Sequence, residues 1–110
     1  MTFGCAYAQQ EFTIEHNFVR SKFITDDRWQ KECPIKTSVT FLPKRKYKVI
    51  ITMDTLTHVY DILDIENHFD ENGNEITRIE LDKKVVIFLK QNLEIQLLYV
   101  DKKCLLIFSS

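Results

Sequence analysis

The chain has 110 residues, of which 45% are hydrophobic and 28% charged, and its formal net charge is −1. This composition is that of one globular domain, large enough to bury a core without metals or disulfides, and it excludes a disordered chain. The near-neutral charge supplies no overall field that would select nucleic acid or an acidic membrane as a partner.

The first eight residues, MTFGCAYA, differ in character from the rest of the chain. The tripeptide Ala-Tyr-Ala at residues 6–8 fits the small-x-small pattern read by signal peptidase, so Gln9 would begin the mature protein. We therefore predict that residues 1–8 are the remnant of a signal peptide and that residues 9–110 form a single β domain. The expected location is periplasmic or secreted.

Two other interpretations of this start remain open. The tripeptide Phe-Gly-Cys at residues 3–5 resembles the end of a lipoprotein signal, which would make Cys5 a lipid anchor. If Met1 is the genuine start, the protein would be cytoplasmic.

The cysteine count depends on this choice. Removal of residues 1–8 leaves Cys33 and Cys104, which could form a disulfide in an oxidising compartment. The alternative is two buried free thiols, because free cysteine behaves as a small hydrophobic residue. None of the spacings is a CxxC, so zinc binding and thioredoxin-type chemistry have no support.

From Glu11 onward, apolar residues recur with the period of two that is typical of β-strands. The expected strands cover residues 11–18, 37–42, 47–53, 58–69, 75–81, 85–90, 93–100 and 104–108. In the first strand we expect Phe12, Ile14 and Phe18 on one side. Residues 25–33 (TDDRWQKEC) lack the alternation, so we predict a loop or one helical turn there, with Trp29 packed as a lid on the core.

Most polar breaks between these strands are too short for parallel crossovers, which need a dozen or more residues. The fold class is therefore all-β, an antiparallel meander of about eight strands. Closure would remove exposed edges, which favours a small barrel of lipocalin-like architecture. A two-sheet β-sandwich is the alternative.

The segment FDENGNEI, residues 69–76, contains one of the two glycines of the chain. The Asn72-Gly73 pair predicts a two-residue type I′ turn, in which His68 would face Thr77. The same register places Tyr60, Ile62, Ile79 and Leu81 on one face. It also places Asp64 and Glu66 there, so we expect a β-bulge near residues 63–65.

No constellation in the sequence carries recognisable catalytic or ligand chemistry. The glycine of FDENGNEI does not have EF-hand spacing, and no glycine-rich phosphate loop is present. Asp64, Glu66 and His68 alternate along one strand as metal ligands might, but same-face residues lie about 6.6 Å apart. We therefore predict no catalytic residue, no metal and no cofactor, and we favour a protein that is not an enzyme.

Charge is distributed unevenly along the chain. Residues 54–80 carry eight acidic residues against the single cation Arg78, or one minus eight, a net −7. The candidate interaction surface combines a basic cluster with acidic residues: Lys44, Arg45, Lys46, Glu66, Asp70 and Glu71. The alternative is solvated surface. Nucleic acid is not an expected partner because the acidic hairpin would repel phosphate, and no apolar run approaches the roughly 18 residues of a membrane span.

The run KVIITMDTLTHVYDILDIENHFDENGNEI (residues 48–76) and the ending IQLLYVDKKCLLIF (residues 95–108) are similar to a loose group of small exported bacterial proteins without assigned activity. The resemblance covers about residues 37–108 and rests on structural motifs rather than catalytic ones. It implies an exported β domain and supplies no site residues.

Three functions remain open at this level. The first is a non-enzymatic exported domain that binds a partner protein or a small apolar ligand. The second is an inhibitor or immunity-type protein that uses the acidic hairpin. The third is a hydrolase of unknown type.

Overall fold

A computed structural model describes residues 11–26, 28–42 and 47–109, and these contain strands but no helix. The predicted signal remnant and Lys44, Arg45 and Lys46 lie outside the described residues. The strands of the described residues are β1 (Phe12–His16), β2 (Phe18–Phe23), β3 (Thr37–Leu42), β4 (Lys48–Met53), β5 (Leu56–Phe69), β6 (Glu75–Leu81), β7 (Val85–Lys90), β8 (Ile95–Tyr99) and β9 (Cys104–Ser109).

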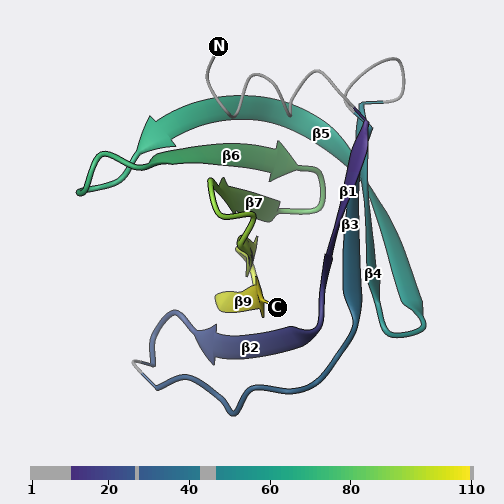
Figure 1. Ribbon diagram of the computed structural model, residues 1–110, viewed down its shortest axis with the longest axis vertical. Coiled ribbons are helices and arrows are strands. Elements are labelled where there is room, and N and C mark those ends of the chain that lie inside the picture. Colours follow the sequence, from purple (N-terminus) through teal and green to yellow (C-terminus); the bar gives the residue numbers. More distant parts are fainter. Residues whose placement is uncertain (1–10, 27, 43–46, 110) are drawn as a thin grey trace.

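All nine strands belong to one antiparallel sheet, in the order β1-β3-β4-β5-β6-β7-β8-β9-β2. The two outermost strands, β1 and β2, are consecutive in the chain and are separated only by Asn17. The Asn17 N–H donates a hydrogen bond to the Ser109 carbonyl at 3.1 Å, beside the β2–β9 pairing. The sheet is therefore rolled into a nearly closed barrel (Figure 1), and the predicted all-β antiparallel meander is confirmed.

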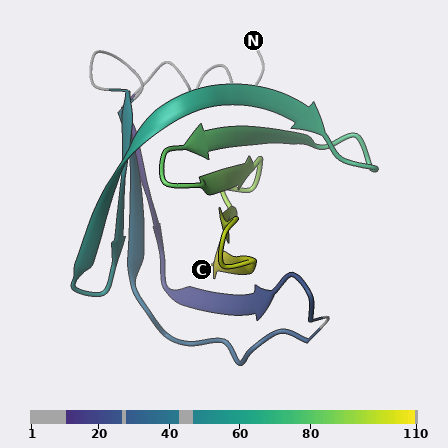
Figure 2. The same ribbon diagram turned by 180° about the vertical axis from the view of Figure 1, so that it is seen from behind.

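β5 carries the sheet around its bend. Its first half pairs with β4 and its second half with β6, and both views show it curving over the molecule (Figure 2). The register shifts between Ile62, which faces Leu81, and Asp64, which faces Glu80. The predicted bulge is therefore present, at Leu63. Beyond it the alternation reverses, so Ile65 packs against the core while Asp64 is exposed.

The barrel interior is filled by the inward-facing side chains of every strand. Val39, Ile87, Ile95, Leu97 and Phe108 have no exposed surface at all. The complete cluster is Ile14, Val19, Val39, Phe41, Val49, Ile51, Tyr60, Ile62, Ile79, Leu81, Val85, Ile87, Leu89, Ile95, Leu97 and Phe108. Each large aliphatic side chain buried in this way contributes about 1.5–3 kcal/mol to folding.

Strand β2 was missed because the alternation is interrupted at Asn17. Val19 belongs to the core, whereas Phe18, one residue earlier, does not join it as predicted. The free edge of β2 is covered by residues 30–33: Val19 and Cys33 exchange two backbone hydrogen bonds of 2.9 Å. The described residues of the segment 25–33 form no helix, so of the two predicted alternatives, a loop or one helical turn, the loop is present.

The sequence predicts that Trp29 covers the core, but the structure places it elsewhere. Its ring lies 5.1 Å from Cζ of Arg20 and 4.8 Å from Nζ of Lys22, both on the outer face of β2. The two cations hold the indole by cation–π contacts, with Trp29 half-buried.

The β5–β6 hairpin has a different register from the predicted one. His68 faces Ile76 rather than Thr77, and Asp70 and Asn74 close a three-residue loop through a 2.9 Å backbone hydrogen bond. Within this loop, only Gly73 has a positive φ, of 82°. Asn72 and Gly73 do lie in the turn, but the loop has three residues, so the two-residue prediction was wrong.

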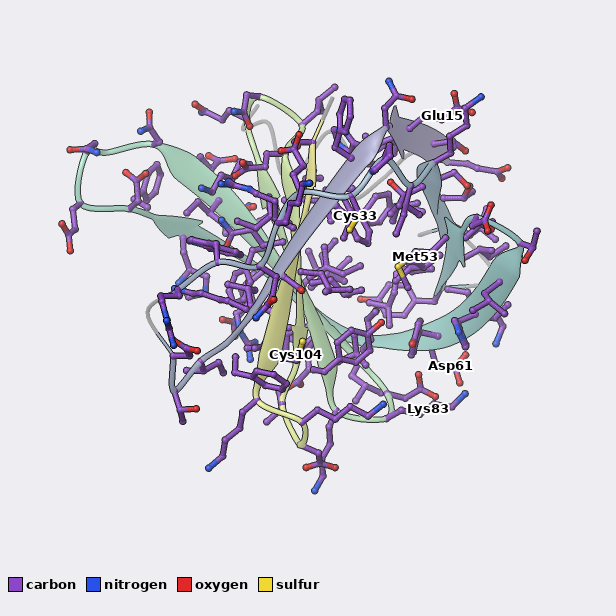
Figure 3. The ribbon with its side chains drawn as sticks, turned by 90° about the horizontal axis from the view of Figure 1, so that it is seen from below. Glu15, Cys33, Met53, Asp61, Lys83 and Cys104 are labelled. Atoms are coloured by element: carbon purple, nitrogen blue, oxygen red, sulfur yellow. The ribbon has the colours of Figure 1, made fainter. Side chains whose placement is uncertain are left out.

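The possible disulfide is also wrong, because Cys33 and Cys104 are both free. Cys33 lies opposite Val19 on one edge of β2, and Cys104 lies opposite Phe23 on the other edge. Four residues of strand span about 13 Å. A disulfide needs Cα atoms within about 7 Å. The two sulfurs are well separated in Figure 3, and Cys33 is exposed rather than buried.

Candidate binding surface

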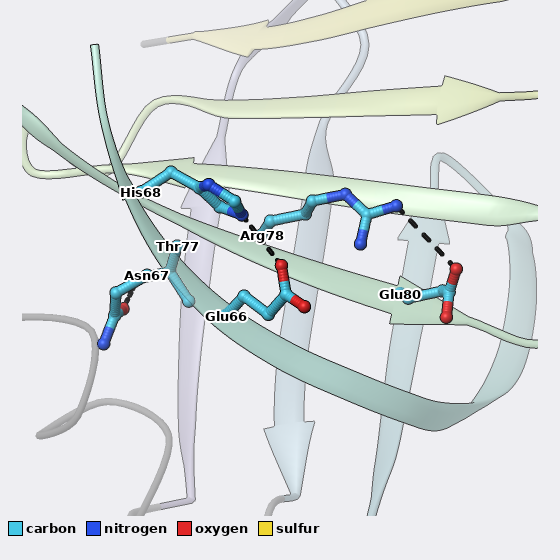
Figure 4. Close-up of polar contacts among 6 residues, drawn as sticks. All are labelled: Glu66, Asn67, His68, Thr77, Arg78 and Glu80. Atoms are coloured by element: carbon cyan, nitrogen blue, oxygen red, sulfur yellow. Dashed lines mark hydrogen bonds and ion pairs between the residues drawn. The ribbon is translucent and has the colours of Figure 1, made fainter.

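The acidic residues of the proposed interaction surface are mostly engaged by groups of the chain itself. Glu66 accepts a hydrogen bond of 2.9 Å from Nε2 of His68 (Figure 4). Asp70 accepts backbone hydrogen bonds from Asn72 at 2.9 Å and Asn74 at 2.8 Å, while Glu71 is exposed at the loop. The structure therefore separates these three residues into two local arrangements instead of one acidic patch.

Other acids of residues 54–80 are similarly paired. Asp61 forms an ion pair with Lys48, and Glu80 lies 3.7 Å from Arg78. Glu75 is buried, at 5% exposure. The net charge of −7 therefore overstates the field that this hairpin presents to a partner.

The histidines do not assemble a metal centre. Among residues 11–26, 28–42 and 47–109, no group of three or more His, Cys, Asp or Glu side chains could hold an ion. His16 is buried, and its Nε2 donates to the Leu93 carbonyl at 2.8 Å. This hydrogen bond joins β1 to the β7–β8 turn, which gives His16 a structural role.

A different part of the surface gathers lysines. The β6–β7 and β8–β9 turns both contain Asp-Lys-Lys, at residues 82–84 and 101–103. Val100 N–H donates to the Lys84 carbonyl at 3.0 Å, and Nζ of Lys84 lies 3.3 Å from Asp101. The two turns therefore lie side by side. We call their four lysines the lysine end: Lys83, Lys84, Lys102 and Lys103.

Three lysines of the lysine end have left-handed backbone conformations. The φ angles are 60° at Lys83, 58° at Lys84 and 51° at Lys103. This conformation costs a residue with a Cβ roughly 1–2 kcal/mol, a cost that glycine avoids and asparagine reduces. The chain has lysine at three positions where turn geometry favours smaller residues.

Two tyrosines lie beneath these lysines. Nζ of Lys83 is 5.6 Å from the Tyr60 ring, and Nζ of Lys102 is 5.8 Å from the Tyr99 ring. Burial, followed by the charge of Tyr60 and a hydrogen bond to it, raises the pKa of Tyr99 to about 12. The Tyr99 ring therefore offers an uncharged π face to Lys102 at neutral pH.

A groove lies beside the lysine end, on the outside of β5, β6 and β7. It is an open hollow of about 500 Å³ whose apolar floor contains Leu63, Val86 and Val100. The bulge leaves Leu63 59% exposed, and Val100 is 45% exposed in its turn. Val86 faces outward because its neighbours in β7 face the core, but it is covered, with 4% of its surface exposed. We call this hollow the outer groove.

The rim of the outer groove carries both signs of charge. Arg78, Lys83 and Lys84 supply three cations against the acids Glu80 and Asp82, or three minus two, a net +1. The Asp82 carboxylate accepts the Asp61 N–H at 3.0 Å. Both rim acids therefore have partners within the chain.

Two further hollows described by the structure are smaller and more polar. One, of about 300 Å³, lies between the tips of the β5–β6 and β7–β8 hairpins and includes Asp70 and Lys90. The other, of about 310 Å³, includes Glu15, Lys36 and Asp54. Neither combines exposed apolar side chains with a net positive rim.

Sequence reasoning did not identify the outer groove. Alternation alone assigns Val86 to a buried strand and gives no sign that it faces outward. The repeated Asp-Lys-Lys motif was the available signal, because it marks two equivalent turns that the sheet places together.

In the part of the chain that is described, no helix is long and apolar enough to cross a membrane. Comparison with protein-family models, curated proteins and solved structures gives no match to this chain. The similarity to small exported bacterial β proteins therefore stays an expectation from the sequence.

Proposed function

We propose that this chain is a non-enzymatic β domain that binds a partner protein on its outer surface. The observation that carries the proposal is the outer groove, in which Leu63 and Val100 are exposed beside a rim of three cations and two acids. Grooves of this kind suit an apolar anchor surrounded by polar contacts, the usual anatomy of a protein interface.

The packed interior argues against a small apolar ligand inside the barrel. Side chains with no exposed surface, including Ile87, Leu97 and Phe108, occupy the space that a ligand would need. Displacing any of them would expose apolar surface at about 25 cal/mol per Å². The outer surface is therefore the better place for recognition.

The acidic hairpin is a weaker candidate surface. Glu66 and Glu80 are engaged by His68 and Arg78, and Asp70 caps its own loop. An inhibitor that relies on these acids would first have to break such contacts.

Export of the domain is part of the same proposal and is tested separately. The motivating observation is the Ala-Tyr-Ala tripeptide at residues 6–8. Intact mass and N-terminal sequencing of the protein from its native cells should show a chain that begins at Gln9. A chain that retains Met1 would remove this part of the proposal.

Site-specific photo-crosslinking tests partner binding. A benzoylphenylalanine replaces Leu63 or Val100 in the outer groove, and Leu56, which is 63% exposed on the same strand as Leu63, is the matched control position. In native cells we expect a discrete larger adduct from the two groove positions and not from Leu56. No adduct, or the same adducts from all three positions, would contradict partner binding at the groove.

A further inference from the structure

We propose that the partner binds the outer groove through an acidic peptide segment that carries one large apolar side chain between carboxylates. This inference rests on the proposed function and names the chemistry of the partner. It follows from the floor, the rim and the neighbouring lysine end taken together.

The floor selects an apolar anchor. Leu63 and Val100 expose about half of their surfaces, and the hollow of about 500 Å³ has room for a large side chain and its flanking backbone. Apolar anchors in such depressions usually carry most of the binding energy of an interface. A leucine or phenylalanine is the simplest occupant.

The rim and the lysine end favour negative charge beside that anchor. The two Asp-Lys-Lys turns carry four lysines and two aspartates, or four minus two, a net +2. Lys83 and Lys84 border the groove itself, and Lys102 and Lys103 lie in the adjoining turn. Carboxylates beside the anchor would therefore meet the ammonium groups of Lys83, Lys102 and Lys103, and would compete with Asp101 for Lys84.

The rim acids favour a peptide over a continuous polyanion. Glu80 and Asp82 lie among the cations, so a phosphate-rich surface such as a membrane or nucleic acid would meet repulsion along with attraction. A peptide can direct its carboxylates to the lysines and pass uncharged backbone over the two acids. The mixed rim therefore matches a short segment with discrete charges.

Fluorescence anisotropy with labelled seven-residue peptides tests this inference. The probe carries a central leucine or phenylalanine flanked on each side by three glutamates or aspartates. One control peptide replaces the acids with glutamine and asparagine, and the other replaces the central residue with alanine. We expect the probe to bind at least tenfold more tightly than either control, and to weaken as salt rises from 50 to 500 mM.

Variants of the domain then locate the contact. The Lys83→Glu/Lys84→Glu protein should bind the probe at least tenfold more weakly, and Lys31→Glu/Lys36→Glu, at exposed lysines elsewhere, should bind within twofold of wild type. Leu63→Asn should weaken binding, whereas Leu56→Asn should not.

A last variant separates recognition from folding. In Lys83→Asn/Lys84→Asn, asparagine suits the left-handed backbone, so this protein should melt no lower than wild type yet bind the probe more weakly. Unchanged binding in this variant would show that the lysines have only a structural role and would overturn the inference.

The competing ligands and the proposed function fail in distinguishable ways. Anionic vesicles or an oligonucleotide that bind at Lys83 and Lys84, while the acidic peptide does not, would overturn the peptide chemistry. If the peptides fail but cross-links from Leu63 and Val100 persist, partner binding stands and its acidic character is wrong. If both fail, both proposals are wrong.

Discussion

Asp70 and Asn74 hold the tip of the β5–β6 hairpin through two reciprocal contacts. The Asp70 N–H donates to the Asn74 carbonyl at 2.9 Å, and the Asn74 N–H donates to the Asp70 carboxylate at 2.8 Å. Together with the Asn72 N–H, these bonds fix a three-residue loop. A group of residues that suggested an ion site is therefore a side-chain-capped turn.

The stability of this loop should depend on the charge of Asp70. The backbone N–H of Asn74, chiefly, lowers the pKa of the Asp70 carboxyl below its usual value, although desolvation opposes the shift. Because the folded pKa is lowered, the stabilisation is present above the unfolded value of about 3.9 and is lost as pH falls through the folded value. The melting temperature of wild type should therefore exceed that of Asp70→Asn at pH 7, and this difference should disappear below about pH 4.

Glu71→Gln is the control for that measurement, since Glu71 is exposed in the same loop. Its melting temperature should follow wild type at neutral pH. If the difference in melting temperature between wild type and Asp70→Asn stays constant from pH 7 to pH 2, the ionised carboxylate does not stabilise the loop.

Gly73 should be sensitive to substitution for reasons of backbone geometry alone. Its φ is 82°, and a Cβ added there would meet no atom within 4 Å. Gly73→Ala should therefore cost about 1 kcal/mol of unfolding free energy, and Gly73→Asn less, because asparagine tolerates the left-handed region. Urea denaturation provides the measurement, and an equal cost for the two variants would contradict this explanation.

The packed interior predicts a steep dependence on side-chain volume at Ile87. This residue has no exposed surface and lies in the middle of β7. Ile87→Val should cost about 0.5–1.5 kcal/mol and Ile87→Ala about 2–5 kcal/mol. Leu63→Ala, at an exposed position, should stay within about 0.5 kcal/mol of wild type in the same denaturation series. A small effect at Ile87 would indicate a loosely filled barrel.

The thiols should be chemically distinguishable. Cys33 is exposed and Cys104 is half-buried, and both are free. Brief treatment of the native protein with iodoacetamide, followed by peptide mapping, should label Cys33 before Cys104. Detection of a disulfide-linked peptide that joins Cys33 to Cys104 would contradict the separation of their strands.

Tyr99 should make the fold sensitive to alkali. Its pKa is raised to about 12, mainly by burial and then by Tyr60. A raised folded pKa means that the stabilisation is complete below the unfolded value of about 10 and is lost as pH rises toward the folded value. Between pH 9 and 12, the melting temperature should decrease less steeply with pH for Tyr99→Phe than for wild type. Tyr47→Phe, at a more exposed tyrosine, should retain the wild-type slope.

Much of the fold could be predicted because buried strands alternate regularly. Period two predicted the strands at residues 37–42 and 47–53, whose Val39, Val49 and Ile51 lie in the core. The shared face of Asp64 and Glu66 required the bulge now seen at Leu63. The hairpin register could not be obtained in this way, because the Asp70 side chain determined the loop length. Preference for Asn-Gly turns pointed to a shorter loop.

The proposed binding surface was harder to predict than the core. Leu63 is exposed because a bulge displaces it, and Val100 joins it only after three hairpins have brought β5 and the β8–β9 turn together. Such proximity depends on how the sheet curls. The residues chosen from charge alone, Glu66 and Asp70, have partners within the chain.

The position of Asn17 has a consequence for the order of events during synthesis. β1 and β2 come first among the described strands, and β1 pairs with the next strand, β3, but β2 pairs with β9, the last of them. Until Ser109 has emerged, β2 lacks its partner β9, and closure must bring together residues about ninety positions apart. The hairpins from β3 to β9 can form one after another, so β2 is the last of the described strands to find its strand partner.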